Sequence, residues 1–258
     1  MLYFDDMKNI LFLIVICATV SLSQGSAGSS AKYEPRFLID VPTGGIIPHG
    51  MLATDIEFFQ QGGVLASISL GLFDIMGLGM SYGGANIIGD NSPVWNELPG
   101  INFRFRLINE SIIFPAIAFG FDSQGKELYD RANQRYTIKS PGFYIVGSKN
   151  YLLLGNLSFH GGINYSLERT DGDRDPNIFI GTEKSIGPIV SILAEYNLGW
   201  NDSNAKAFGK GRGYLNGSAR VSIGDGFSIG INLKDILKNQ KKITIGNRTI
   251  LLEYVQEL

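Results

Sequence analysis

The chain has 258 residues, with 22 basic and 24 acidic side chains and a formal net charge of −2. Glycine contributes 33 residues, nearly twice its usual share of about 7%, whereas charged residues make up only 18% of the chain. This composition excludes a disordered, collagen-like or disulfide-rich protein. The near-neutral charge provides no long-range attraction for phosphate backbones, so we expect no nucleic-acid partner.

The N-terminus has the pattern of a secretory signal peptide. Residues 1–23 combine a lysine, an apolar run over residues 10–20 and small residues before an expected cleavage after Ser23. The acidic residues before Met7 indicate that the true start is Met7. The apolar run is too short for a transmembrane helix, which needs about 20 residues. Cys17 follows a large side chain rather than the small one of a lipidation site, so lipidation is not expected.

Long segments with period-two alternation follow a predicted N-terminal periplasmic link at residues 24–50. In residues 215–223, for example, apolar or small side chains alternate with asparagine, serine and arginine, which is the strand period. Most segments approach the 9 to 11 residues that a tilted strand needs to cross a bilayer, against about 5 to 6 in soluble domains. Their second face carries glycine and serine, as a barrel interior does.

The predicted fold is therefore all-β: an antiparallel transmembrane β-barrel of about 12 strands over residues 51–258, with short periplasmic turns and longer extracellular loops. We expect strands to start near residues 51, 63, 75, 100, 111, 141, 156, 177, 188, 213, 227 and 248. Connections of alternating length support this topology, because long ones at 84–99, 122–139, 168–176 and 200–212 are separated by short ones. Outer-membrane lipid is then a partner, and a secreted soluble β-sandwich is the alternative fold.

Charged residues inside the strands are expected to face the lumen. An arginine or lysine facing lipid near mid-bilayer costs about 2 to 4 kcal/mol. The candidate lumen-lining residues are Arg104, Arg106, His160, Glu183, Glu195 and Arg220. Lys210 and Arg212, in the glycine-rich loop at 209–213, are candidate outer-loop contacts for anionic sugars. Aromatic residues near strand ends, namely Tyr82, Phe121, Tyr151, Trp200 and Tyr214, are expected in the interfacial girdles.

The residues predict no catalytic, cofactor-binding or metal site. Ser158, His160 and Asn164 share one strand face, but neighbours at i and i+2 lie about 6 to 7 Å apart, too far for a nucleophile and its base. Two histidines and no cysteine after the leader disfavour a transition-metal site. The loop with Asp171, Asp173 and Asp175 lacks the calcium-loop pattern, so we expect a solvated acidic loop.

Residues 99–202 resemble the YjbH-like outer-membrane proteins, a β-barrel family linked to exopolysaccharide production. The matching stretches are 99–110 (PGINFRFRLINE), 114–125 (FPAIAFGFDSQG), 144–149 (YIVGSK), 160–164 (HGGIN), 179–183 (FIGTE) and 194–196 (AEY). The resemblance implies a non-enzymatic, porin-like protein of the outer membrane of a Gram-negative-type bacterium that serves polysaccharide secretion or surface assembly.

The resemblance also implies partners: polysaccharide, polysaccharide-export components and the barrel-insertion machinery. Two alternative functions stay open. One is a general diffusion channel or structural barrel without a sugar partner, and the other is a barrel-embedded hydrolase that depends on His160.

Overall fold

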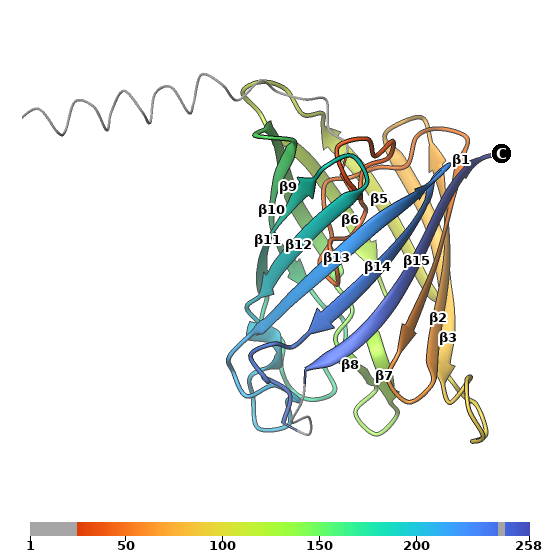
Figure 1. Ribbon diagram of the computed structural model, residues 1–258. Helices are drawn as coiled ribbons and strands as arrows, with labels where there is room; N and C mark the ends of the chain where they lie inside the picture. The colour runs from red at the N-terminus through yellow and green to blue at the C-terminus, as the bar shows by residue number, and fades with distance from the viewer. Residues whose placement is uncertain (1–24, 242–245) are drawn as a thin grey trace, which may run out of the picture.

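The computed structural model describes residues 25–241 and 246–258. The predicted signal peptide at 1–23, the start at Met7 and Cys17 lie outside the described residues. Twelve long strands form a closed antiparallel barrel (Figure 1). They are β1 (Met51–Phe59), β2 (Gly63–Leu72), β3 (Met76–Ala85), β5 (Gly100–Ile108), β6 (Ala116–Asp122), β9 (Gly142–Leu152), β10 (Asn156–Tyr165), β11 (Asn177–Ile186), β12 (Val190–Asn197), β13 (Tyr214–Gly224), β14 (Phe227–Lys234) and β15 (Asn247–Glu257).

The remaining elements are small and lie in loops. β4 (Val94–Trp95) adds to the end of β3, β7 (Lys126–Asp130) and β8 (Arg135–Ile138) form a separate hairpin, and η1 (Trp200–Asp202) is a single 3-10 turn. Within the described part of the chain, none of the helical structure has the length and hydrophobicity required to span a membrane.

The barrel closes because its last strand pairs with its first. β15 runs antiparallel to β1 from Met51 opposite Glu257 to Phe58 opposite Ile250. Closure gives the backbone groups of every strand a partner, which the hydrocarbon core requires. The predicted fold is thereby confirmed.

The strand starts agree with those predicted except at β6, which begins at Ala116 instead of near residue 111. Pro115 has no N–H to donate to a ladder, so regular pairing starts after it. Residues 111–114 form a turn instead, in which the amide of Ser111 donates to the carbonyl of Phe114.

Short turns gather at one end of the barrel and long loops at the other (Figure 1). The tightest turn joins β13 to β14 through Asp225 and Gly226, whose φ angles are 45° and 80°. Two successive positive φ values are what a two-residue hairpin turn of type I′ requires. The β1–β2 connection at residues 60–62 is the short exception at the long-loop end.

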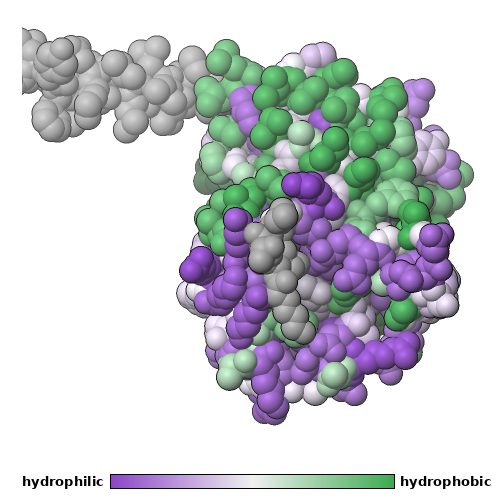
Figure 2. Space-filling view, turned by 60° about the horizontal axis from the view of Figure 1, so that its bottom comes forward, coloured by the Kyte–Doolittle hydropathy of each residue, from purple (hydrophilic) through white to green (hydrophobic). Residues whose placement is uncertain are grey.

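The outer surface of the barrel wall is apolar. Its outward side chains include Met80, Ile101, Leu107, Ile145, Ile163, Ile180 and Ile231, all about half exposed or more. Figure 2 shows this hydrophobic wall above a mostly hydrophilic end, the end that carries the long loops. A closed barrel with such a belt is the architecture of outer-membrane proteins. The chain is accordingly an integral outer-membrane barrel of a Gram-negative-type envelope.

Aromatic residues at the strand ends do not all face lipid. Tyr82 is 42% exposed and stacks on Trp95 at 5.7 Å, and Trp200 is 50% exposed, as expected for girdle positions. Tyr214 is only 4% exposed, and its hydroxyl donates to Asp202 inside the barrel. The prediction for Tyr214 was wrong because a tyrosine at a strand end fits either face, and here a buried carboxylate accepts from its phenol.

Residues 25–50 enter the barrel from the short-turn end, where Ser29, Ser30, Lys32 and His49 stay exposed, and most of the segment is buried in the lumen (Figure 1). We call these residues the plug. The predicted periplasmic link is wrong here, because Leu38, Val41 and Thr43 are at most 2% exposed within the barrel. A ring of eight strands is just filled by its own side chains, so a ring of twelve leaves room for a further segment.

We predict that Ile231→Arg destabilises the barrel by about 2 to 4 kcal/mol, because Ile231 lies in the middle of β14 and points outward with 63% exposure. Unfolding titrations in lipid vesicles, followed by heat-modifiable gel mobility, measure the change. Ile231→Leu is the matched control and should stay within about 0.5 kcal/mol. An arginine variant as stable as the leucine variant would contradict the assignment of this face to lipid.

Candidate functional site in the plugged lumen

The centre of the plug is a short hairpin at residues 36–43. The amide of Leu38 donates to the carbonyl of Val41, and that of Thr43 donates to the carbonyl of Arg36, both at 3.0 Å. Phe37 and Pro42 form a bridge between the two arms. The hairpin therefore presents its turn, residues 38–41, to the surrounding wall.

Glu195 on β12 binds the tip of the hairpin. The backbone amides of Ile39, Asp40 and Val41 donate to its carboxylate at 2.9 to 3.1 Å. The Asn216 side chain on β13 adds a further donor at 2.7 Å. Glu195 is 1% exposed, so these donors replace the water that a buried carboxylate loses. Successive amides converging on one anion form a nest.

Two arginines hold the carbonyls of the same segment. Arg104 on β5 donates to the carbonyls of Thr43 at 3.2 Å and Gly45 at 2.8 Å. Arg220 on β13 donates to the carbonyl of Leu38. Together with Glu195, they bind the main chain of the plug from three different strands of the wall.

Serine hydroxyls of the wall complete the main-chain contacts. The amide of Gly44 donates to Ser148 on β9, and that of Gly28 donates to Ser191 on β12, both at 2.7 Å. These two serine side chains accept hydrogen bonds from backbone amides of the plug and not from its side chains.

Three ion pairs join plug side chains to the wall. Arg106 pairs with Glu34, Asp55 on β1 pairs with Arg36, and Lys234 on β14 pairs with Asp40. Lys234 also contacts Glu57, which in turn pairs with Lys126 of β7 at 3.0 Å. This chain of charges connects the plug to the loop hairpin β7–β8.

An apolar patch of the inner wall receives the plug. Leu38 and Val41 pack with a buried cluster formed by Ala118, Tyr144, Val146, Phe179 and Leu193. Gly181 permits this contact, because a Cβ there would lie 2.2 Å from Leu38 Cδ1. The inner face is therefore more apolar here than the alternation predicted.

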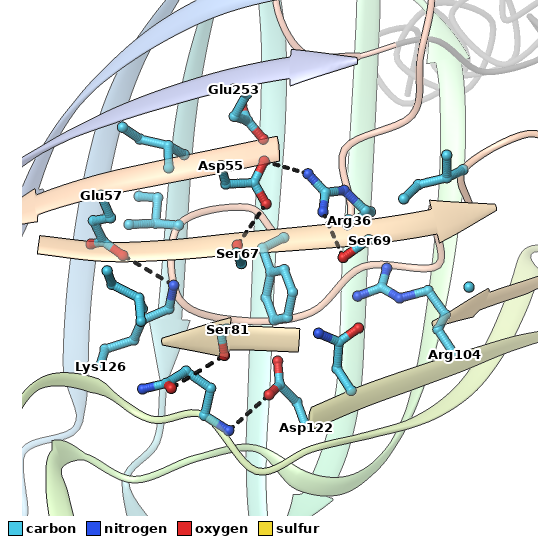
Figure 3. Close-up of a pocket in the computed structure, with 18 of the residues that line it drawn as sticks. Arg36, Asp55, Glu57, Ser67, Ser69, Ser81, Arg104, Asp122, Lys126 and Glu253 are labelled. Atoms are coloured by element: carbon cyan, nitrogen blue, oxygen red, sulfur yellow. Dashed lines mark hydrogen bonds and ion pairs between the residues drawn. The ribbon is translucent and has the colours of Figure 1, made fainter. Parts of the chain in front are cut away.

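A cavity of about 70 Å³ lies between the plug and β1, β2, β3, β5 and β6 (Figure 3). Arg36 spans it, donating to Asp55 and to Ser69 at 3.4 Å, while Ser67 donates to Asp55 at 3.1 Å. Its polar lining and size suit a few water molecules.

The sequence-predicted lumen residues all face inward. Arg104, Arg106, His160, Glu183, Glu195 and Arg220 are between 0% and 9% exposed. All but His160 contact the plug: Glu183 lies against Gly25, and the other four are described above. Lys210 and Arg212 are exposed in the outer loop between β12 and β13, where Asn239 accepts from both of their backbone amides.

His160 has a partner that the single-strand argument missed. Its Nδ1 lies 2.6 Å from Ser148 Oγ, because Ser148 is directly opposite His160 on β9. Nε2 of His160 has no hydrogen-bond partner among the described residues, so no third group orients the imidazole as in a hydrolytic triad. Ser148 also accepts from the plug, and the pair serves as a plug contact.

The outer end is closed by loops around Arg135. Its guanidinium, which is fully buried, pairs with Asp171 at 2.6 Å and Asp202 at 2.7 Å, and Lys139 pairs with Asp171 at 2.8 Å. Asp173 accepts from the amide of Ser203 at 2.9 Å. We call this cluster the outer cap.

The expected solvated acidic loop is therefore wrong for Asp171 and Asp173, which are 2% and 5% exposed. Two basic side chains that are distant in the sequence, Arg135 and Lys139, contact this loop. Asp175 is exposed. Across residues 25–241 and 246–258, no group of three or more histidine, cysteine or acidic side chains is placed to hold a metal ion.

Comparison with known proteins gives structural likeness alone. No family model matches the chain, and no curated protein matches it. Among solved structures it is similar to a KdgM porin, with 10% identity, a TM-score of 0.48, and coverage of 79% of this chain and 98% of that one. It is also similar to the outer membrane protein Omp33 of Acinetobacter baumannii, with 10% identity, a TM-score of 0.39, and coverage of 81% and 97%.

A third similar structure is the outer membrane channel DcaP of Acinetobacter baumannii, with 7% identity, a TM-score of 0.29, and coverage of 82% of this chain and 97% of that one.

Replacing Arg135 by methionine should destabilise the outer cap by about 3 to 5 kcal/mol, because it leaves two buried carboxylates without their shared cation. Protease sensitivity of the outer loops in intact vesicles measures the effect. Arg174→Met, in an exposed position of the same cap, is the control. Equal protection of both variants would contradict the role given to Arg135.

The cap should also respond to acid. Burial alone would raise the pKa of Asp171, but hydrogen bonds from Lys139, the amide of Asp173 and Arg135 hold this pKa below its ordinary value of 3.8. A lowered carboxylate pKa stabilises the folded cap above the ordinary value, and this stabilisation disappears as pH falls through the folded value. Loop protection should not decrease between neutral pH and about 4 and should decrease below it; a decrease already at pH 6 would contradict this origin.

Proposed function

We propose that the protein is a non-enzymatic, YjbH-like outer-membrane barrel associated with exopolysaccharide secretion or surface assembly. In this proposal the lumen is the path for a sugar chain, and the plug keeps it closed at rest. Polysaccharide-export components deliver the chain, and the barrel-insertion machinery assembles the protein in the membrane.

The observation that carries the proposal is the polar contact between plug and wall. Ion pairs and hydrogen bonds such as Glu195 with residues 39–41 can exchange their partners for water or for the hydroxyl groups of a sugar. A hydrogen bond to a charged group such as Glu195 contributes about 1.5 to 3 kcal/mol net, because water can replace the partner that is lost. The plug can therefore leave as water or ligand takes its place, whereas a wholly apolar plug would resist withdrawal.

The position of the plug also favours this proposal over a general diffusion channel. Small solutes would need a permanently open lumen, but Leu38 and Val41 occupy the lumen in contact with β6, β9, β11 and β12. A gated path fits a large and specific passenger better. The hydrolase alternative receives no support from His160, because Ser148 is engaged by both His160 and the plug.

We predict that Leu38→Asp opens the barrel. The substitution places a charge among Tyr144, Val146, Phe179 and Leu193, which costs several kcal/mol unless the plug moves into water. Leu38 is not part of the barrel wall, so the strands remain intact. Single-channel recording in planar bilayers should show conducting events at least about tenfold more often than in the wild type, and Leu38→Met is the matched control.

A disulfide between Gly44→Cys and Ser148→Cys tests whether the plug is the gate. A Cβ on Gly44 would lie 3.1 Å from Ser148 Cβ, so the plug backbone must move away by about half an ångström to reach the Cβ–Cβ spacing of about 3.5 to 4.5 Å in a disulfide. In the Leu38→Asp background, oxidation should abolish conductance and a reductant should restore it, whereas either cysteine alone should have no redox effect. Conductance that persists after complete oxidation would overturn the proposal.

A further inference from the structure

The inner wall recognises the plug mainly through its amide groups. Glu195 accepts from backbone N–H groups, whereas Arg104 and Arg220 donate to backbone carbonyls. Ser148 and Ser191 add two more main-chain contacts. When the plug leaves, the wall presents an acceptor for N–H, two donors for C=O and an adjoining apolar floor.

The floor consists of Tyr144, Phe179 and Leu193, which pack on Leu38 and Val41 in the closed state. Arg104 lies 5.8 Å from the ring centroid of Tyr144, and Gly181 lies close to both Leu38 and Glu195. The polar groups and the floor are thus neighbours in one site. A mostly apolar surface with a few fixed polar groups is typical of a small-molecule or sugar subsite.

The charge of the wall selects against a polyanion. The inward basic residues of the barrel strands are Arg104, Arg106, Arg220 and Lys234, whereas the inward acidic ones are Asp55, Glu57, Asp122, Glu183, Glu195 and Glu253. Acidic side chains are in excess, so an unplugged lumen repels a uronate chain. A neutral chain has no such barrier.

We propose that the lumen binds a neutral glycan that carries acetamido groups, as N-acetylhexosamine polymers do. Each acetamido group offers the N–H and C=O that the plug main chain offers to Glu195, Arg104 and Arg220, and its methyl group fits the apolar floor. A polymer repeats the acetamido group along its length and can therefore bind the wall in many positions. The plug can bind the wall in only one position. This inference rests on the proposed function and names its substrate class.

Ligand-driven withdrawal of the plug gives the test. The full-length protein with Ser148→Cys is reconstituted in vesicles, and the rate of thiol modification by a maleimide is measured. Residue 148 is 5% exposed under Gly44, so modification requires plug movement. The probes are tetramers of β-1,4-linked N-acetylglucosamine, of β-1,4-linked glucose and of galacturonate, together with a peptide of residues 34–46.

The N-acetylglucosamine tetramer should accelerate modification about tenfold more than the glucose tetramer, which differs only in carrying hydroxyl groups in place of the acetamido groups. Tenfold corresponds to about 1.4 kcal/mol, near the lower end of the range of about 1.5 to 3 kcal/mol for one hydrogen bond to a charged group. Glu195→Gln should remove this difference. Asp122→Asn should retain it, because this buried inward carboxylate on β6 accepts from the amide of Gln124 and not from the plug.

The possible outcomes are distinct. Equal acceleration by the glucose tetramer, or a larger effect of galacturonate, overturns the acetamido inference and leaves the polysaccharide function standing. Acceleration by the peptide alone overturns it in favour of a polypeptide ligand. If no probe acts while the disulfide still controls conductance, gating stands and both sugar assignments fall.

Discussion

A closed ring of twelve strands encloses more space than its own side chains fill. The bilayer forces the ring to close, because each unpaired backbone group in hydrocarbon costs several kcal/mol. The interior must then hold either water or another part of the chain. In this protein it holds the plug, residues 25–50, and the arrangement of the lumen depends on that fact.

The plug explains why charged residues of the strands are so deeply buried. Arg220 and Glu195 are 0% and 1% exposed, which no water-filled pore would produce. Each binds main-chain groups of the plug as well as a wall neighbour, Glu253 for Arg220 and Asn216 for Glu195. The same contacts that stabilise the closed state define the chemistry of the wall when the plug is absent. Closure and ligand selection are therefore two consequences of one set of side chains.

The two ends of the lumen are closed by different means. The plug enters from the short-turn end and is held largely through its backbone, whereas the outer cap depends on Arg135 between two aspartates. Asp40, Lys234, Glu57 and Lys126 form a continuous series of ion pairs from the plug to the β7–β8 hairpin. Movement of the plug removes Asp40 from this series and so changes the charge that faces the β7–β8 hairpin.

Much of the wall was predictable from the sequence, because strand period and loop length are local properties. The alternation around residues 215–223 placed Arg220 inward, and a similar pattern placed Glu195. The start of β6 could not be predicted from alternation. Pro115 has no N–H to donate, so regular strand pairing begins only after it even where side chains alternate.

The plug could not be predicted from period alone, because the wall residues that hold it are distant in the sequence. A signal was nevertheless present. In residues 143–146 and 178–180 both strand faces are apolar, which a lumen filled with water does not explain. Tyr144, Val146 and Phe179 form the floor on which Leu38 packs. The cross-strand partnership of Ser148 with His160 likewise depends on register, which only the folded barrel fixes.

Hydrogen–deuterium exchange at the amides of residues 39–41 tests the central claim most directly. These amides donate to Glu195 inside the barrel, and the plug is held in place by exchangeable polar contacts. The account predicts protection well above that of an unfolded chain but clearly below that of the barrel strands, since the plug opens while the wall stays closed. Exchange at the rate of an unfolded chain would place the segment outside the lumen. Exchange as slow as in the barrel strands would show that the plug never leaves the lumen while the barrel is folded.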